Sequence, residues 1–207
     1  MILSKFLAKQ LGNPSGLLGR LVAAPVLNKR NSALNDATFD RLDLRPHDRV
    51  LEVGFGGGYL IGRMAAIVTD GFLAGVDVSP AMVAYCQERY RSQVRAGKLE
   101  LKCASAESLP YPPGHFTRVC TVNSIFYWEN VPQALAEMWR VLEEGGRLVM
   151  CFTCKRCLEG REFTRHGVTL YEENQVQQMM EAAGFHAIDM AHASDRHREF
   201  VCVAGTK

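Results

Sequence analysis

Apolar and polar residues alternate with two different periods between residues 48 and 205. Short apolar runs and alternation of period two are typical of strands, and apolar residues three or four positions apart are typical of helices. The two kinds of segment follow one another along the chain, which predicts an α/β fold with a mostly parallel sheet. The expected strands are 49–53, 72–76, 99–103, 116–123, 147–153, 185–190 and 199–204, and the expected helices are 59–68, 79–95, 132–142 and 172–183. We expect the last two strands to pair antiparallel at one edge.

Residues typical of helix ends support these boundaries. Ser79 followed by Pro80 is typical of an N-cap and the first helical position. Gly145 and Gly146 are expected to end one helix, and Gly184 another, because glycine adopts the left-handed backbone found after helices.

The first 45 residues differ in character from the rest. They are apolar and basic, and Gly12, Pro14 and Pro25 divide them into short helical pieces. Residues 1–35 hold five basic side chains and no acidic one. We therefore divide the chain into a helical cover, 1–45, and a main domain, 46–207. Contact of the cover with an anionic membrane surface is a less favoured alternative.

Composition narrows the classes of partner and the cellular setting. A chain of 207 residues with 47% hydrophobic content can bury the core of one domain. A net charge of +2 does not favour binding to nucleic acid. Seven cysteines, an odd number, favour a reducing compartment over a disulfide framework. The sequence shows no signal-peptide pattern, so we expect a cytoplasmic protein.

A glycine-rich turn with two acidic partners is the main candidate site. Glu52, Gly54, Gly56 and Gly58 lie between the first strand and the first helix of the main domain. Asp77 ends the next strand, 19 positions after Gly58. Glycines there allow close approach of the backbone to a ligand, and a carboxylate at that spacing can accept the hydroxyls of a ribose.

The details of the turn separate two kinds of nucleotide cofactor. Dinucleotide-binding turns carry a third glycine where this chain has Tyr59. Glu52 is also poorly suited to a pyrophosphate neighbour. It suits a ligand with an ammonium group, such as the methionine part of S-adenosylmethionine, reached through a bridging water.

At this point the chain resembles the class I S-adenosylmethionine-dependent methyltransferases, in the branch that includes small-molecule and ubiquinone-pathway enzymes. The resemblance covers residues 48–205 and is carried by 50–58 (VLEVGFGGG), 75–80 (GVDVSP), 104–111 (ASAESLPY) and 140–148 (RVLEEGGRL). It implies a Rossmann-like seven-stranded sheet, mostly parallel with the last strand antiparallel and with helices on both faces. It also implies S-adenosylmethionine as the cofactor.

The resemblance assigns cofactor-binding roles to particular residues. Asp77 would bind the ribose hydroxyls, Val78 and Met82 would pack on the adenine, and Asn123 would offer its carbonyl to the cofactor amine. The three glycines Gly54, Gly56 and Gly58 would line the methionine and ribose parts, and Ser105, Ala106 and Glu107 would edge the adenine. Many relatives carry an Asp where this chain has Ser105. Serine forms a weaker, uncharged hydrogen bond there.

The methyl acceptor is expected to be a small molecule bound near Tyr127 and Trp128, just after the fourth strand. The alternative is that these aromatic rings only pack under a loop. Methyl transfer depends mainly on positioning, so no catalytic motif is required, and His166 is the candidate base if one is needed. A nucleic-acid or protein methyltransferase, and a lipid or metalloid acceptor, remain open alternatives.

The other histidines and the cysteines carry weaker hypotheses. We expect His115 to be solvated, and His186, His192 and His197 to lie away from the site. Cys151, Cys154 and Cys157 have the spacing C-x-x-C-x-x-C, which could bind a soft metal. A fourth ligand is missing and free cysteines are common in cores, so we expect no metal.

Overall fold

Buried side chains cover both faces of the central strands in the computed structural model, which describes residues 29–207. In β1 (Arg49–Val53), Leu51 belongs to the core on one face of the sheet, whereas Val50 belongs to the core on the other. Successive side chains of a strand point to opposite faces, so these strands need helices on both sides.

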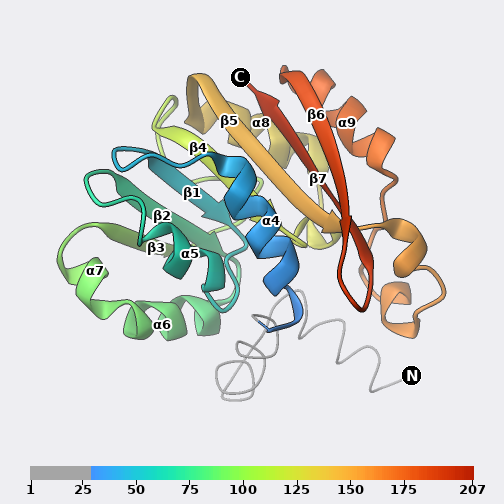
Figure 1. The fold of residues 1–207 in the computed structure, drawn as a ribbon, viewed down its shortest axis with the longest axis horizontal. Helices are drawn as coiled ribbons and strands as arrows, with labels where there is room; N and C mark the ends of the chain where they lie inside the picture. The colour runs from blue at the N-terminus through green and yellow to red at the C-terminus, as the bar shows by residue number, and fades with distance from the viewer. Residues whose placement is uncertain (1–28) are drawn as a thin grey trace.

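One sheet of seven strands forms in the order β3-β2-β1-β4-β5-β7-β6 (Figure 1). The neighbours from β3 to β5 pair in parallel, whereas β7 is antiparallel to both β5 and β6. The predicted fold class, with the last strand antiparallel, is confirmed. The other strands are β2 (Phe72–Asp77), β3 (Leu99–Cys103), β4 (Phe116–Val122), β5 (Leu142–Thr153), β6 (His186–Ser194) and β7 (Glu199–Thr206).

Helices cover the two faces separately, as predicted. Figure 1 shows α4 crossing the front of the sheet, and α4, α5 and α6 share one core. The other core contains α8 and α9. The helices are α4 (Ser32–Leu42), α5 (Tyr59–Met64), α6 (Pro80–Arg89), α7 (Arg91–Arg95), α8 (Val131–Val141) and α9 (Glu173–Ala182), with short 3-10 turns η2 (Ile125–Tyr127), η3 (Lys155–Cys157) and η4 (Glu162–Arg165).

Two helix predictions were wrong in their limits. The single helix expected over 79–95 is divided at Tyr90, whose hydroxyl donates to the carbonyl of Gly58 at 2.6 Å. The helix expected over 59–68 ends at Met64. The helix expected over 132–142 agrees with α8 to within one residue, but Gly145 and Gly146, which were expected to end it, lie in β5. The N-cap prediction is confirmed, since the Ser79 hydroxyl accepts from the Met82 amide at 3.2 Å.

The predicted helical cover lies mostly outside the described residues. Its described part is α4, which packs on β4, β5 and α5. Residues 1–28, which carry most of the basic segment and the membrane alternative, lie outside that part. Among the described helices, none combines the length and the apolar character needed to cross a bilayer.

Candidate active site

A cavity of about 1110 Å³ lies at the carboxyl ends of β1, β2 and β4. The order of the strands reverses between β1 and β4, and the loops that follow them diverge there. This is the position where open α/β sheets bind ligands. Most residues predicted from the sequence line this cavity: Glu52, Gly54, Gly56, Asp77, Val78, Ser105, Ala106, Glu107, Asn123, Tyr127, Trp128 and His166.

Met82 and Gly58 do not line the cavity, which corrects two of the proposed cofactor contacts. Met82 is completely buried in the core that α6 shares with the sheet. Gly58 begins α5 with a φ of 70°, and a Cβ there would approach the Cys86 sulfur to 2.8 Å. Both residues therefore support the glycine-rich turn through packing, on the side away from the cavity.

Glu52 is a buried acid that lacks a partner for one of its oxygens. It lies in β1, the Ile61 amide donates to its carboxylate, and the buried Oε2 has no hydrogen-bond partner. Burial first, and then the negative charge of Asp77, raise the pKa of Glu52 to about 8, against the opposing effect of the Ile61 amide. An unpaired acceptor of this kind fits a cationic ligand.

Asp77 is held in place by two backbone amides. Its Oδ1 accepts from Ser79 N and its Oδ2 from Gly56 N, both at 2.9 Å. Burial raises the pKa of Asp77, and these two amides lower it. Each oxygen keeps a second lone pair, so the carboxylate can still accept two hydroxyl groups. In the described part of the chain, no lysine or arginine forms an ion pair with Asp77 or Glu52.

Two glycines leave the space that a ligand needs. Gly54 has a φ of 78°, and a Cβ there would approach the Ser124 Cβ to 2.8 Å. Gly56 has a φ of 50°, and a Cβ there would meet no protein atom within 4 Å. The space above Gly56 is thus open to the cavity, next to the carboxylate that its amide holds. These residues fit a ligand that carries both a cation and a ribose.

Comparison with known protein families and structures decides between the candidate cofactors. The family model described as methyltransferase domain matches residues 51–150. The Bacillus subtilis (strain 168) protein named uncharacterized methyltransferase YdaC is 27% identical over 187 residues, which are 90% of this chain and 98% of that protein. The chain is an S-adenosylmethionine-dependent methyltransferase.

Two further comparisons bear on the fold and on the branch of this methyltransferase. A crystal structure of an S-adenosylmethionine-dependent methyltransferase from Aquifex aeolicus superposes with a TM-score of 0.67 at 19% identity, covering 97% of each chain. The ubiquinone/menaquinone biosynthesis C-methyltransferase UbiE of Vibrio parahaemolyticus is 34% identical over 126 residues. That match covers 59% of this chain and 48% of the relative, so the chain spans about half of that protein's length.

Asn123 connects three elements at the floor of the methyltransferase cavity. It follows β4 with a left-handed φ of 55°. Its side-chain oxygen accepts from the amide and the hydroxyl of Thr153, at 2.9 and 3.1 Å. Its Nδ2 donates to Asn31 Oδ1 at 3.1 Å, which joins the start of α4 to the sheet. The side chain therefore fixes this part of the cavity wall by joining β4, β5 and the start of α4.

Ser105 and Glu107 bind each other as well as lining the cavity. The Ser105 hydroxyl donates to Glu107 Oε2 and accepts from the Glu107 amide at 3.1 Å. The second oxygen of Glu107 accepts from Glu129 N at 2.9 Å. The Ser105 hydroxyl thus holds the Glu107 side chain, which ties this loop to the loop of Glu129.

Aromatic and apolar side chains form one part of the cavity wall. Phe126, Tyr127, Trp128, Leu158 and Phe163 line it and also pack on the core that contains α8. Tyr127 and Trp128 therefore do both: their rings pack on the core and also line the cavity. Burial raises the pKa of Tyr127 to about 12, so its hydroxyl stays protonated at neutral pH.

The remaining histidine predictions hold in part. His166 lines the cavity. His115 was expected to be solvated, but it is half-buried and stacks on Tyr111 with ring centroids 5.9 Å apart. His197 was expected to lie away from the site, but it lines a smaller pocket that adjoins the cavity. No local pattern predicts this, because the turn before β7 places His197 beside Arg30 and Arg198 only in the folded chain.

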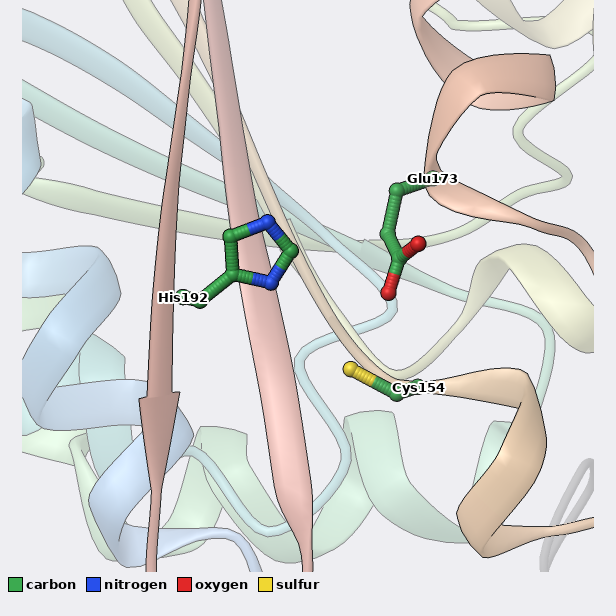
Figure 2. Close-up of side chains that lie close together, drawn as sticks. All are labelled: Cys154, Glu173 and His192. Carbon is green, nitrogen blue, oxygen red and sulfur yellow. The ribbon is translucent and has the colours of Figure 1, made fainter.

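The three cysteines of the C-x-x-C-x-x-C segment do not form one ligand set in the described structure. Cys151 contributes to the core on the α4 face, whereas Cys154 contributes to the core on the α8 face. Figure 2 shows Cys154 beside Glu173 and His192. The Cys154 sulfur, a Glu173 carboxylate oxygen and a His192 ring nitrogen all lie within 4.8 Å of one another. Burial first, and then the hydrogen bond to Glu173, raise the pKa of Cys154 to about 12. The closeness of Cys154 and Glu173 is that of a neutral thiol donating a hydrogen bond to a carboxylate.

Proposed function

We propose that this methyltransferase transfers a methyl group to a small molecule with a planar, apolar body, by in-line displacement. The observation that carries the proposal is the aromatic wall of Phe126, Tyr127 and Trp128, which lines the same cavity as Asp77 and Glu52. The name of the Vibrio relative, a quinone-pathway C-methyltransferase, supports a ring-shaped acceptor.

Bound S-adenosylmethionine supplies a methyl group on a sulfonium, from which a neutral thioether leaves readily. The chain then has to bind the cofactor and the acceptor, hold them in line and exclude water. We assign Asp77 to the ribose hydroxyls, Glu52 to the ammonium through a water, and the backbone carbonyl of Asn123 to the same amine. Val78, with 45% of its surface exposed in the cavity, packs on the adenine, and the 105–107 loop edges the ring.

His166 is our candidate for the base where the acceptor must lose a proton. Among the described histidines it is the one that lines the main cavity. An imidazole can take up a proton at neutral pH, whereas Tyr127 stays protonated there and cannot serve as a base. This role applies to phenol-like acceptors and is not needed for a thiolate.

The N-terminal residues 1–45 complete the proposal as a cover over the site. Asn31 and Asn35 line the cavity at the start of α4, directly after the segment outside the described residues. Closure of such a segment would exclude water from the displacement. We also propose a cytoplasmic setting, since all seven cysteines are free thiols, and no role for nucleic acid.

An acceptor screen tests the proposed function. Release of S-adenosylhomocysteine is measured with phenols, hydroquinones, amines, thiols and metalloid oxyanions, with tRNA and a DNA duplex as the macromolecular arm. We expect turnover with planar ring acceptors, and lower kcat/KM in Trp128→Ala while the affinity for S-adenosylhomocysteine is retained. Turnover on nucleic acid alone would replace the proposal with the macromolecular alternative.

A further inference from the structure

A smaller, basic pocket of about 330 Å³ adjoins the acceptor end of the cavity. The two hollows share Arg30, Thr153, Leu158 and Arg198 in their walls. The remaining wall of the smaller pocket is formed by Cys157, Arg161 and His197. We call it the arginine pocket. It brings together residues from the start of α4, the loop after β5 and the start of β7.

Arg198 is built into this pocket from two directions. Asp195 Oδ1 accepts from the amides of His197 and Arg198, at 2.7 and 3.0 Å, and closes the turn before β7. The guanidinium then points inward, with 9% of the side chain exposed. It donates to Asn31 Oδ1 at 2.9 Å and to the carbonyl of Arg30, while its buried Nε has no hydrogen-bond partner.

Positive charge in the arginine pocket exceeds negative charge. Asp195 lies 3.7 Å from Arg198 and is the one carboxylate within ion-pair distance of it among the described residues. In the same part of the chain, Arg30 and Arg161 form no ion pair, and Arg161 donates its Nε hydrogen to the Cys157 carbonyl at 3.0 Å. Burial lowers the pKa of Arg198 and the charges of Arg30 and Arg161 lower it further, whereas Asp195 opposes the fall. An anion would relieve both effects.

The chemistry of the pocket selects its ligand. Guanidinium groups present several donors in one plane and match the oxygens of carboxylates and phosphates. Arg30 also lies close enough to Tyr127 to influence its pKa, so the pocket is near the aromatic wall. A molecule could therefore lie with its ring on that wall and an anionic group among the arginines.

We propose that the arginine pocket binds an anionic group, a carboxylate or a phosphate, of the methyl acceptor. The inference rests on the proposed function, since it assigns to the same acceptor a second point of attachment. It identifies the substrate class as an amphipathic acid, with a planar or apolar body and an anionic end.

The first test measures binding of an anion without any acceptor. Inorganic diphosphate is titrated calorimetrically into the protein saturated with S-adenosylhomocysteine. We expect Arg161→Gln and Arg198→Gln to raise its Kd by about tenfold or more, which is about 1.4 kcal/mol. Arg95→Gln removes the same charge from the exposed surface of α7 and should leave the Kd within about twofold of the original, since exposed surface charges contribute little.

Two results of this titration would overturn the inference. One is absence of diphosphate binding in a protein that still binds S-adenosylhomocysteine. The other is equal weakening by Arg95→Gln, which would show a general effect of charge. Arg161 is exposed, so its substitution keeps the test valid if Arg198→Gln does not fold.

A second test distinguishes the two sources of the anion and separates failure of the pocket from failure of the proposed function. Acceptors are compared in pairs that differ in the anionic group: phenol with 4-hydroxybenzoate, and an allylic alcohol with its diphosphate. We expect the charged member of one pair to be preferred, and Arg161→Gln to remove that preference. Equal turnover of both members would refute the pocket's role and leave the proposed function standing. No turnover of any acceptor would count against the proposed function, and the diphosphate titration would still decide the pocket.

Discussion

Substitution of Glu52 should stabilise the protein without cofactor and weaken cofactor binding at the same time. The ordinary pKa of this carboxyl is 4.5, and burial followed by repulsion from Asp77 raises it to about 8 in the folded chain. Between these two pH values the folded chain holds a proton that the unfolded chain has released. The contribution of Glu52 to the free energy of unfolding therefore has its full value below about pH 4.5. This contribution is lost as pH rises to about 8.

The size of the effect follows from the same two values. The difference between 8 and 4.5, at about 1.4 kcal/mol per pH unit, sets an upper limit on the order of 5 kcal/mol above pH 8. Water in the open cavity screens part of this cost, so we expect Glu52→Gln to raise the free energy of unfolding by roughly 2–4 kcal/mol at pH 9. The gain should shrink steadily toward pH 5.

Urea unfolding at pH 5, 7 and 9 measures this difference, and Glu137→Gln is the matched control. Hydrogen bonding to Arg140 lowers the pKa of Glu137, so the control substitution should destabilise the protein at neutral pH. Affinity for S-adenosylhomocysteine should rise between pH 6 and 8 in the original protein and stay flat in Glu52→Gln. A stability difference that does not change with pH would refute the account of Glu52 as a buried acid awaiting a cation.

Three further predictions concern the rest of the cavity. Asp77→Ala should weaken binding of S-adenosylmethionine and S-adenosylhomocysteine by about 1.5–3 kcal/mol, the usual value for hydrogen bonds to a charged group, and calorimetry showing unchanged affinity in the folded variant would remove the ribose assignment. Trp128→Ala and Tyr127→Ala should raise the acceptor's KM or lower kcat with cofactor affinity nearly intact, whereas a loss of thermal stability alone would leave only the packing role. His166→Gln should lower kcat for phenol-like acceptors by about 10²-fold or more and leave kcat for a thiol acceptor nearly unchanged, and an unchanged kcat for phenols would exclude it as the base.

The sequence by itself determined the fold class and the cofactor. Alternating strand and helix periods are local properties, and they predicted the sheet on which Leu51 and Val50 face opposite cores. The spacing from Gly58 to Asp77 could be recognised because a β-strand, a short turn and a helix occupy nearly fixed lengths. The position of the acid Glu52 and the residue Tyr59 then favoured S-adenosylmethionine over a dinucleotide.

Tertiary structure decided which side chains face the cavity and which only support it. Met82 and Val78 are four residues apart, yet one is completely buried and the other lines the cavity, because the start of α6 turns between them. The arginine pocket joins Arg30 and Arg198, which are 168 residues apart in the chain. Only the return of β7 alongside β5 brings them together, and no local pattern in the sequence records that contact.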